Sequence, residues 1–87
     1  MGTEVTDNEI ESARITAKMI RSIRKRLGLS QAAFAELVGV NRRSVYQWEH
    51  KEGRLSFRGD AKAAIVGIRK MTKEEAQNQL EALNAQD

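Results

Sequence analysis

Residues 29–49, LSQAAFAELVGVNRRSVYQWE, decide the fold of this chain. Ser30 precedes one run of helical apolar spacing, and Asn41 precedes another. Both residue types are good helix caps, because a side-chain oxygen at that position accepts from free backbone N–H groups. Between the runs, Gly39 favours a left-handed end to the first helix at little conformational cost. The stretch therefore predicts two short helices joined by a tight turn.

The first of these helices is expected to end near Val38, and the second to span about residues 42–51. Val45 and Trp48 lie three residues apart, so they face the core and leave the outer side of the second helix free. Ala35 is small where the two helices cross. Residues 30–51 thus predict a helix-turn-helix, a motif that presents its second helix to the DNA major groove.

The apolar spacing elsewhere predicts three further helices, over about residues 10–27, 60–70 and 72–83. The first of them is expected to bury a face that repeats every four residues. That face consists of Ile15, Met19, Ile23 and Leu27. The Thr72 to Glu75 segment has the spacing of a capping box and so marks the start of the last helix. We predict an all-α fold, a compact five-helix bundle around a helix-turn-helix core.

The length of 87 residues predicts one domain with a modest core. We place that domain at residues 10–83, with a flexible acidic arm at 1–9 and a short tail at 84–87. The chain has no cysteine and a single histidine, which excludes disulfides, thiolate metal centres and sites built on two histidines. No pairing of a nucleophile with a base is evident, so we expect no enzyme, no metal and no cofactor. With no apolar run long enough for a membrane span, we expect a cytoplasmic protein.

Charge is unevenly distributed along the chain. Residues 1–13 carry a formal charge of −4, residues 14–58 of +8 and residues 59–87 of −1. A basic block of this size favours a polyanionic partner, most simply nucleic acid, although a solvated basic surface would have the same composition. The acidic arm is expected to be a solubilising segment; the alternative is that it folds over the basic block and weakens nonspecific binding.

The sequence resembles the lambdoid phage repressor and Cro class of helix-turn-helix domains, a lambda-repressor-like fold, from about Met19 to Ile68. The resemblance rests on several short matches taken together. These are residues 24–31 (RKRLGLSQ), 34–35 (FA), 37–40 (LVGV), 44–45 (SV) and 48–49 (WE). The chain departs from the class after the second helix, where residues 50–57 lack the proline of many relatives.

The resemblance implies roles for individual residues. Arg42, Arg43 and Gln47 occupy positions where the class contacts base edges. Gln31 corresponds to a glutamine that binds a phosphate and braces the first recognition residue, and Ser44 to a phosphate contact. Arg24 and Glu49 match a pair that forms an internal ion pair in some relatives. Further contacts to the DNA backbone are expected from other basic residues of the block, namely Arg21, Lys25, Arg26, Lys51, Arg54 and Arg58.

These observations predict sequence-specific binding of double-stranded DNA by a bacterial or phage transcriptional repressor, associated with the nucleoid when bound. Members of the class commonly bind palindromes as homodimers, so we expect a dimer on DNA. Two other functions remain open. The chain could be the antitoxin of a toxin–antitoxin pair, with a toxin as protein partner, or a protein-interaction module that has lost DNA binding.

Overall fold

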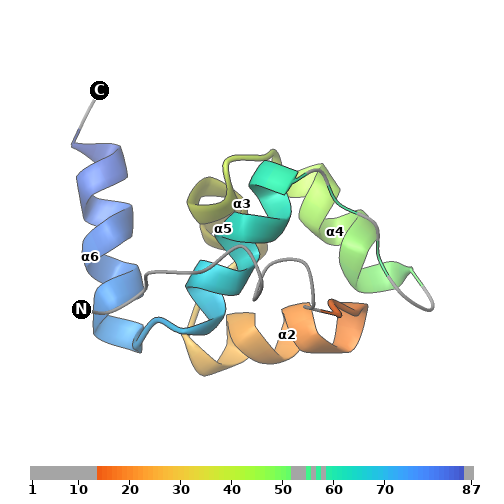
Figure 1. Cartoon of the computed structure of the whole chain (residues 1–87). Coiled ribbons are helices and arrows are strands. Elements are labelled where there is room, and N and C mark those ends of the chain that lie inside the picture. The colour runs from red at the N-terminus through yellow and green to blue at the C-terminus, as the bar shows by residue number, and fades with distance from the viewer. Residues whose placement is uncertain (1–13, 52–54, 56, 58, 86–87) are drawn as a thin grey trace.

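The computed structural model describes residues 14–51, 55, 57 and 59–85 (Figure 1). Within them the chain forms five α-helices and no strand. The helices are α2 (Ala17–Arg26), α3 (Gln31–Val38), α4 (Arg42–His50), α5 (Gly59–Arg69) and α6 (Lys73–Asn84). The predicted all-α, five-helix architecture is confirmed.

The helices surround one apolar core. In Figure 1, α5 runs through the middle of the molecule, while α4 and α6 lie at opposite ends. The largest fully buried side chains come from four of the five helices or the turns that follow them. They are Ile20, Leu27, Phe34, Val45, Ile65 and Ile68. The last helix joins this core through Ala76, which is fully buried, and through the partly buried Leu80.

The first described helix begins later than its apolar spacing predicts. Residues 14–16 are not helical, and Thr16 caps α2 by accepting from the backbone N–H of Met19 at 3.2 Å. The Ile15 carbonyl instead accepts from the backbone N–H of Leu55 at 3.2 Å. The predicted start near residue 10 is therefore wrong for residues 14–16, because a distant segment takes up this backbone. The rest of the expected start, residues 10–13, lies outside the described part.

The buried face of α2 also differs from the predicted one. Ile15, Ile23 and Leu27 are buried as expected, but Met19 is only half-buried. Ile20 is fully buried in its place. Once Ile15 belongs to the extended segment, the four-residue repeat that began there no longer fixes the helix face.

The turn between α3 and α4 forms as the sequence predicts. Ser30 accepts from the backbone N–H of Ala33 at 3.0 Å, and Asn41 accepts from that of Ser44 at 2.9 Å. Gly39 adopts a left-handed conformation with φ of 91°, and its N–H donates to the Ala35 carbonyl at 2.8 Å. These local bonds fix where α3 ends and where α4 begins.

The two C-terminal helices follow a second turn. The predicted capping box of α6 is confirmed, because Thr72 and Glu75 exchange both side-chain-to-backbone hydrogen bonds, at 2.8 and 3.1 Å. Gly59, one residue before the predicted start of this helix near residue 60, is the first residue of α5. None of the described helices is both long and apolar enough to cross a bilayer.

We expect Gly39→Ala to lower the free energy of unfolding by about 1–2 kcal/mol, the cost of a left-handed conformation for a residue with a Cβ. Apart from its two chain neighbours, no atom of the described residues lies within 4 Å of the position the new Cβ would take, so the effect is one of backbone strain. Gly59→Ala is the matched control, because it also meets no atom within 4 Å and its φ is not positive. Urea unfolding of both variants tests this, and equal stabilities would contradict it.

Candidate nucleic-acid interface

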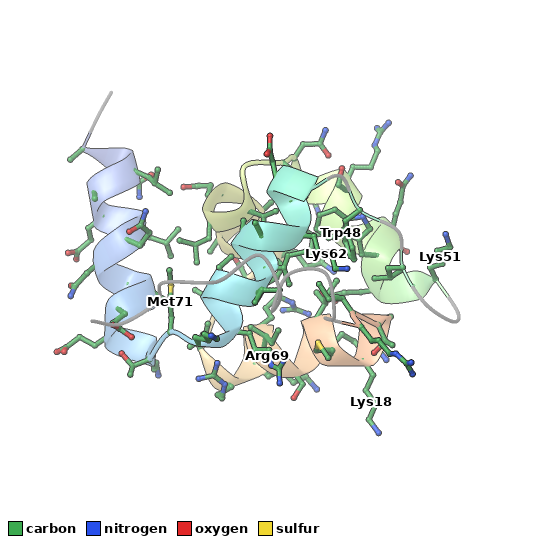
Figure 2. All side chains as sticks on the ribbon, in the orientation of Figure 1. Lys18, Trp48, Lys51, Lys62, Arg69 and Met71 are labelled. Carbon is green, nitrogen blue, oxygen red and sulfur yellow. The ribbon has the colours of Figure 1, made fainter. Side chains whose placement is uncertain are left out.

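The outer face of α4 is polar and exposed, whereas its inner face is buried. The exposed side chains are Arg42, Arg43, Tyr46, Gln47 and His50. On the inner face, Val45 has no exposed surface and Glu49 retains only 4%. Trp48 is half-buried and packs against Phe57, with the ring centroids 4.8 Å apart and the planes at 77°. The sequence placed Trp48 in the core; the structure places it at the edge of the core (Figure 2).

An ion pair holds the inner face of α4 to α2. The Arg24 Nε donates to Glu49 Oε2 at 2.7 Å, and its Nη2 donates to Glu49 Oε1 at 3.0 Å. Two parallel bonds of this kind match the planar guanidinium to the carboxylate and fix the relative orientation of the two groups. The pair implied by the family resemblance is therefore present, and it gives Arg24 a structural role.

Two further side chains donate to Glu49. The Gln31 amide, at the start of α3, donates to Oε1 at 3.2 Å. Arg21 of α2 donates to the Glu49 main-chain carbonyl near the end of α4. Arg24 also binds the segment before α3, because its Nη1 donates to the Leu29 carbonyl at 3.2 Å. The C-terminal half of α4 is thus bonded to both α2 and α3.

These contacts shift the ionisation of the pair. Burial raises the pKa of the Glu49 carboxyl, but hydrogen bonds from Arg24 and Gln31 and the charges of Arg24 and Arg21 more than offset that effect. The pKa of Glu49 is therefore lowered from its ordinary value of 4.5. The hydrogen bond to Glu49 raises the pKa of Arg24 against the opposing effect of burial. Both groups are charged at neutral pH.

Comparison with known families adds to this geometry. Residues 20–58 match the family model described as helix-turn-helix. The match spans the two helices α3 and α4 and the turn between them, and it agrees with the resemblance to the phage repressor and Cro class. The helix-turn-helix is a DNA-binding motif, so the match supports a DNA-binding regulator. No curated protein and no solved structure matches the chain.

Within the helix-turn-helix domain, the predicted base-contacting residues share one exposed surface. Arg42 and Arg43 form the first turn of α4, and Gln47 follows on the same side one turn later. All three side chains are exposed, and none of them forms a hydrogen bond with another described residue.

Gln31 and Ser44 have partners within the domain. The Gln31 amide reaches Glu49, near the end of α4, rather than the first recognition residue at its start. The Ser44 hydroxyl donates to the Asn41 side chain at 3.3 Å. A phosphate contact from Ser44 would have to use the backbone N–H groups around it or displace that hydroxyl.

The basic residues outside α4 fall into two groups. The Arg26 guanidinium donates to the carbonyls of Arg69 and Met71, at 2.7 and 3.0 Å, and so caps the end of α5. In contrast, Lys18, Arg21 and Lys51 line a shallow hollow of about 450 Å³ beside the end of α4. Lys18 and Lys51 project outward there (Figure 2).

Three other basic residues were predicted to contact the DNA backbone, namely Lys25, Arg54 and Arg58. Lys25 is exposed on α2, as a backbone contact requires. Arg54 and Arg58 lie outside the described residues.

Among the described residues, no three or more histidine, cysteine, aspartate or glutamate side chains form a group that could hold a metal ion.

Sequence reasoning did not find one contact on α4. The Tyr46 and His50 rings stack with centroids 4.0 Å apart and planes at 27°. The His50 Nδ1 lies 2.8 Å from the Tyr46 carbonyl oxygen. Their spacing of four residues on one helix is the signal that could have suggested the pair.

The lowered pKa of Glu49 predicts acid sensitivity of the helix-turn-helix domain. The stabilisation from its charged form is complete above the ordinary pKa of 4.5, declines as the pH falls below that value, and is lost below the folded-state pKa. We expect Glu49→Gln to lower the free energy of unfolding at pH 7 by about 2–4 kcal/mol, because Arg24 loses its counter-charge. The variant should also lose less further stability than the wild type on acidification.

Urea unfolding at several pH values between about 7 and 3 measures this difference. Glu36→Gln is the matched control, because it removes the charge of an exposed acid on α3 and leaves the Arg24–Glu49 pair intact. The same acid-induced loss in the wild type and in Glu49→Gln would contradict the assigned role.

Proposed function

We propose that this helix-turn-helix domain binds double-stranded DNA sequence-specifically by inserting α4 into the major groove. The observation that carries the proposal is the two-sided construction of α4. Val45 and Glu49 fix its inner face, while Arg42, Arg43 and Gln47 are exposed on its outer face, where no other described side chain binds their donors. A helix held rigidly from behind and exposed in front suits base readout.

The chemistry of the outer side chains supports direct readout. A guanidinium can donate two parallel bonds to O6 and N7 of guanine, and a glutamine amide can pair with N6 and N7 of adenine. Arg42 and Arg43 therefore favour guanine in the site, with Gln47 next to them on the helix. Each good bidentate contact discriminates by about 1–3 kcal/mol against the wrong base.

Phosphate contacts would come from cations that flank α4. Lys51 and Lys18 are exposed beside its C-terminal end, and Arg21, which donates to the Glu49 carbonyl, lines the same hollow. Lys25 on α2 remains a candidate for a phosphate contact. Gln31, at the start of α3, and Ser44, in the first turn of α4, remain candidates as well. We leave Arg26 out of the proposed interface, because its guanidinium caps α5.

We infer that the protein is a transcriptional repressor, encoded by a bacterium or a phage, and that it acts in the cytoplasm. A protein bound in the major groove over a promoter prevents the polymerase from occupying it, so occlusion is the simplest consequence of binding. We also propose that two copies bind a palindrome, with half-sites about one helical turn apart. A homodimer would double the contact surface of a small domain.

Selection of bound duplexes from a random double-stranded pool at near-physiological salt tests the proposal. An enriched palindrome is the expected result and would support a dimeric, sequence-specific regulator. Salt-sensitive binding without enrichment would reduce the function to nonspecific electrostatics. Absence of duplex binding would overturn the proposal and favour an antitoxin or another protein-interaction module.

We expect Arg42→Ala and Arg43→Ala to weaken binding to the selected duplex by about 1–3 kcal/mol each and to leave nonspecific binding much less affected. Lys51→Ala is the control for charge, because a phosphate contact weakens binding to all sequences alike. Its loss should also lower the slope of log K against log salt by about 0.9. Titrations on specific and unrelated duplexes measure both effects; equal losses on every sequence would remove the two arginines from base readout.

A further inference from the structure

Tyr46 is the one large hydrophobic side chain that the described residues leave exposed, with 50% of its surface accessible. Apart from its neighbour His50, the other side chains on the outer face of α4 are the arginines and glutamine of the proposed interface. A half-exposed aromatic ring is common on a protein surface and needs no explanation by itself. Its position within the proposed interface is what makes it informative.

That position is central. Arg42, Tyr46 and His50 follow one another at four-residue intervals and form a single ridge along α4. Gln47 lies beside Tyr46 on the adjacent row, one turn after Arg43. The ring is therefore flanked on one side by an arginine proposed to contact base edges and on the other by the glutamine proposed to do so.

The ring is also held in place. The His50 imidazole stacks on one of its faces at a centroid distance of 4.0 Å, and that imidazole is itself within hydrogen-bond distance of the Tyr46 carbonyl. Stacking limits the rotamers available to Tyr46, while half of the surface of the residue remains accessible. An apolar surface that is already ordered loses little side-chain entropy on contact with a ligand.

We propose that Tyr46 contacts the C5 methyl group of a pyrimidine in the major groove, and so determines specificity at one base pair next to the guanine contacts. This inference rests on the proposed DNA-binding function. Along the major-groove edges of the base pairs, the C5 methyl is the apolar group among hydrogen-bond donors and acceptors. It is the chemical match for the exposed part of the Tyr46 side chain.

A phosphate contact through the phenol hydroxyl is the main competing role. Such a contact would need only the hydroxyl and would be indifferent to the base. The proposed contact needs the ring and is indifferent to the hydroxyl. Tyr46→Phe and Tyr46→Ala therefore separate the two roles, and both substitutions keep a residue compatible with an exposed helix position.

The test uses the duplex obtained by selection and changes one methyl group at a time. Each thymine is replaced by deoxyuridine, which removes the methyl, and each cytosine by 5-methylcytosine, which adds it. We expect one position at which the methylated form binds the wild-type protein about fourfold more tightly. This factor corresponds to the ~0.8 kcal/mol gained when one methyl-sized apolar group is buried. A response to deoxyuridine identifies thymine as the source, and a response to 5-methylcytosine identifies a methylated cytosine.

The variants complete the experiment. Tyr46→Phe should keep the preference for the methyl, whereas Tyr46→Ala should bind both forms alike. Arg43→Ala is the matched control, because it should weaken binding overall but preserve the ratio between the two forms. Circular dichroism and thermal unfolding establish that each variant is folded.

Three results would overturn the inference. The wild type could bind tightly to its selected duplex without responding to any methyl, which would leave the proposed function intact. Tyr46→Phe and Tyr46→Ala could lose affinity equally on all duplexes, which would assign Tyr46 to a phosphate. Absence of sequence-specific binding would overturn this inference together with the proposed function.

Discussion

The Glu49 carboxylate lies where α2, α3 and α4 meet. Arg24 of α2 and Gln31 of α3 donate to its oxygens, and Arg21 donates to the carbonyl of the same residue. A carboxylate with 4% exposure would be costly without such donors. The charge is satisfied only when the three helices are in register with one another, so one buried group couples the elements of the motif.

This coupling determines what α4 can present. A pair of apolar residues could stabilise the same junction as well or better, but it would fix orientation less tightly than two parallel hydrogen bonds. A helix turns by about 100° per residue, so a rotation of about that size about its axis would carry Arg43 and Gln47 away from the outer face. Val45 and the Arg24–Glu49 pair together favour one rotational setting of α4.

The structure also divides the basic residues by role. Residues 14–58 contain eleven lysine and arginine residues, and their positive charge suggests a polyanionic partner. Yet Arg24 serves an internal ion pair and Arg26 caps α5, so neither is available in the way that Arg42, Arg43 and Lys51 are. Net charge therefore indicates the kind of partner but overstates the number of contacts to it.

The sequence by itself determined the features that arise from bonds between near neighbours. Several helix ends depend only on residues three or four positions away, so they can be predicted from the sequence. They are the caps at Ser30, Asn41 and Thr72 and the left-handed Gly39. The outer and inner faces of α4 follow from helical periodicity in the same way. The Arg24–Glu49 pair was foreseen only through resemblance to a family.

Tertiary structure alone decided the remainder. Helix α2 starts at Ala17, later than predicted, because the Ile15 carbonyl accepts from the backbone N–H of Leu55, forty residues away. The Arg26 guanidinium binds the end of α5 because carbonyl acceptors lie there. Side chains with several donors, such as arginine, bind whichever acceptor the fold brings within reach. Local spacing fixes where a helix can form, but the partners that shorten it or occupy its charged groups come from segments that meet only after folding.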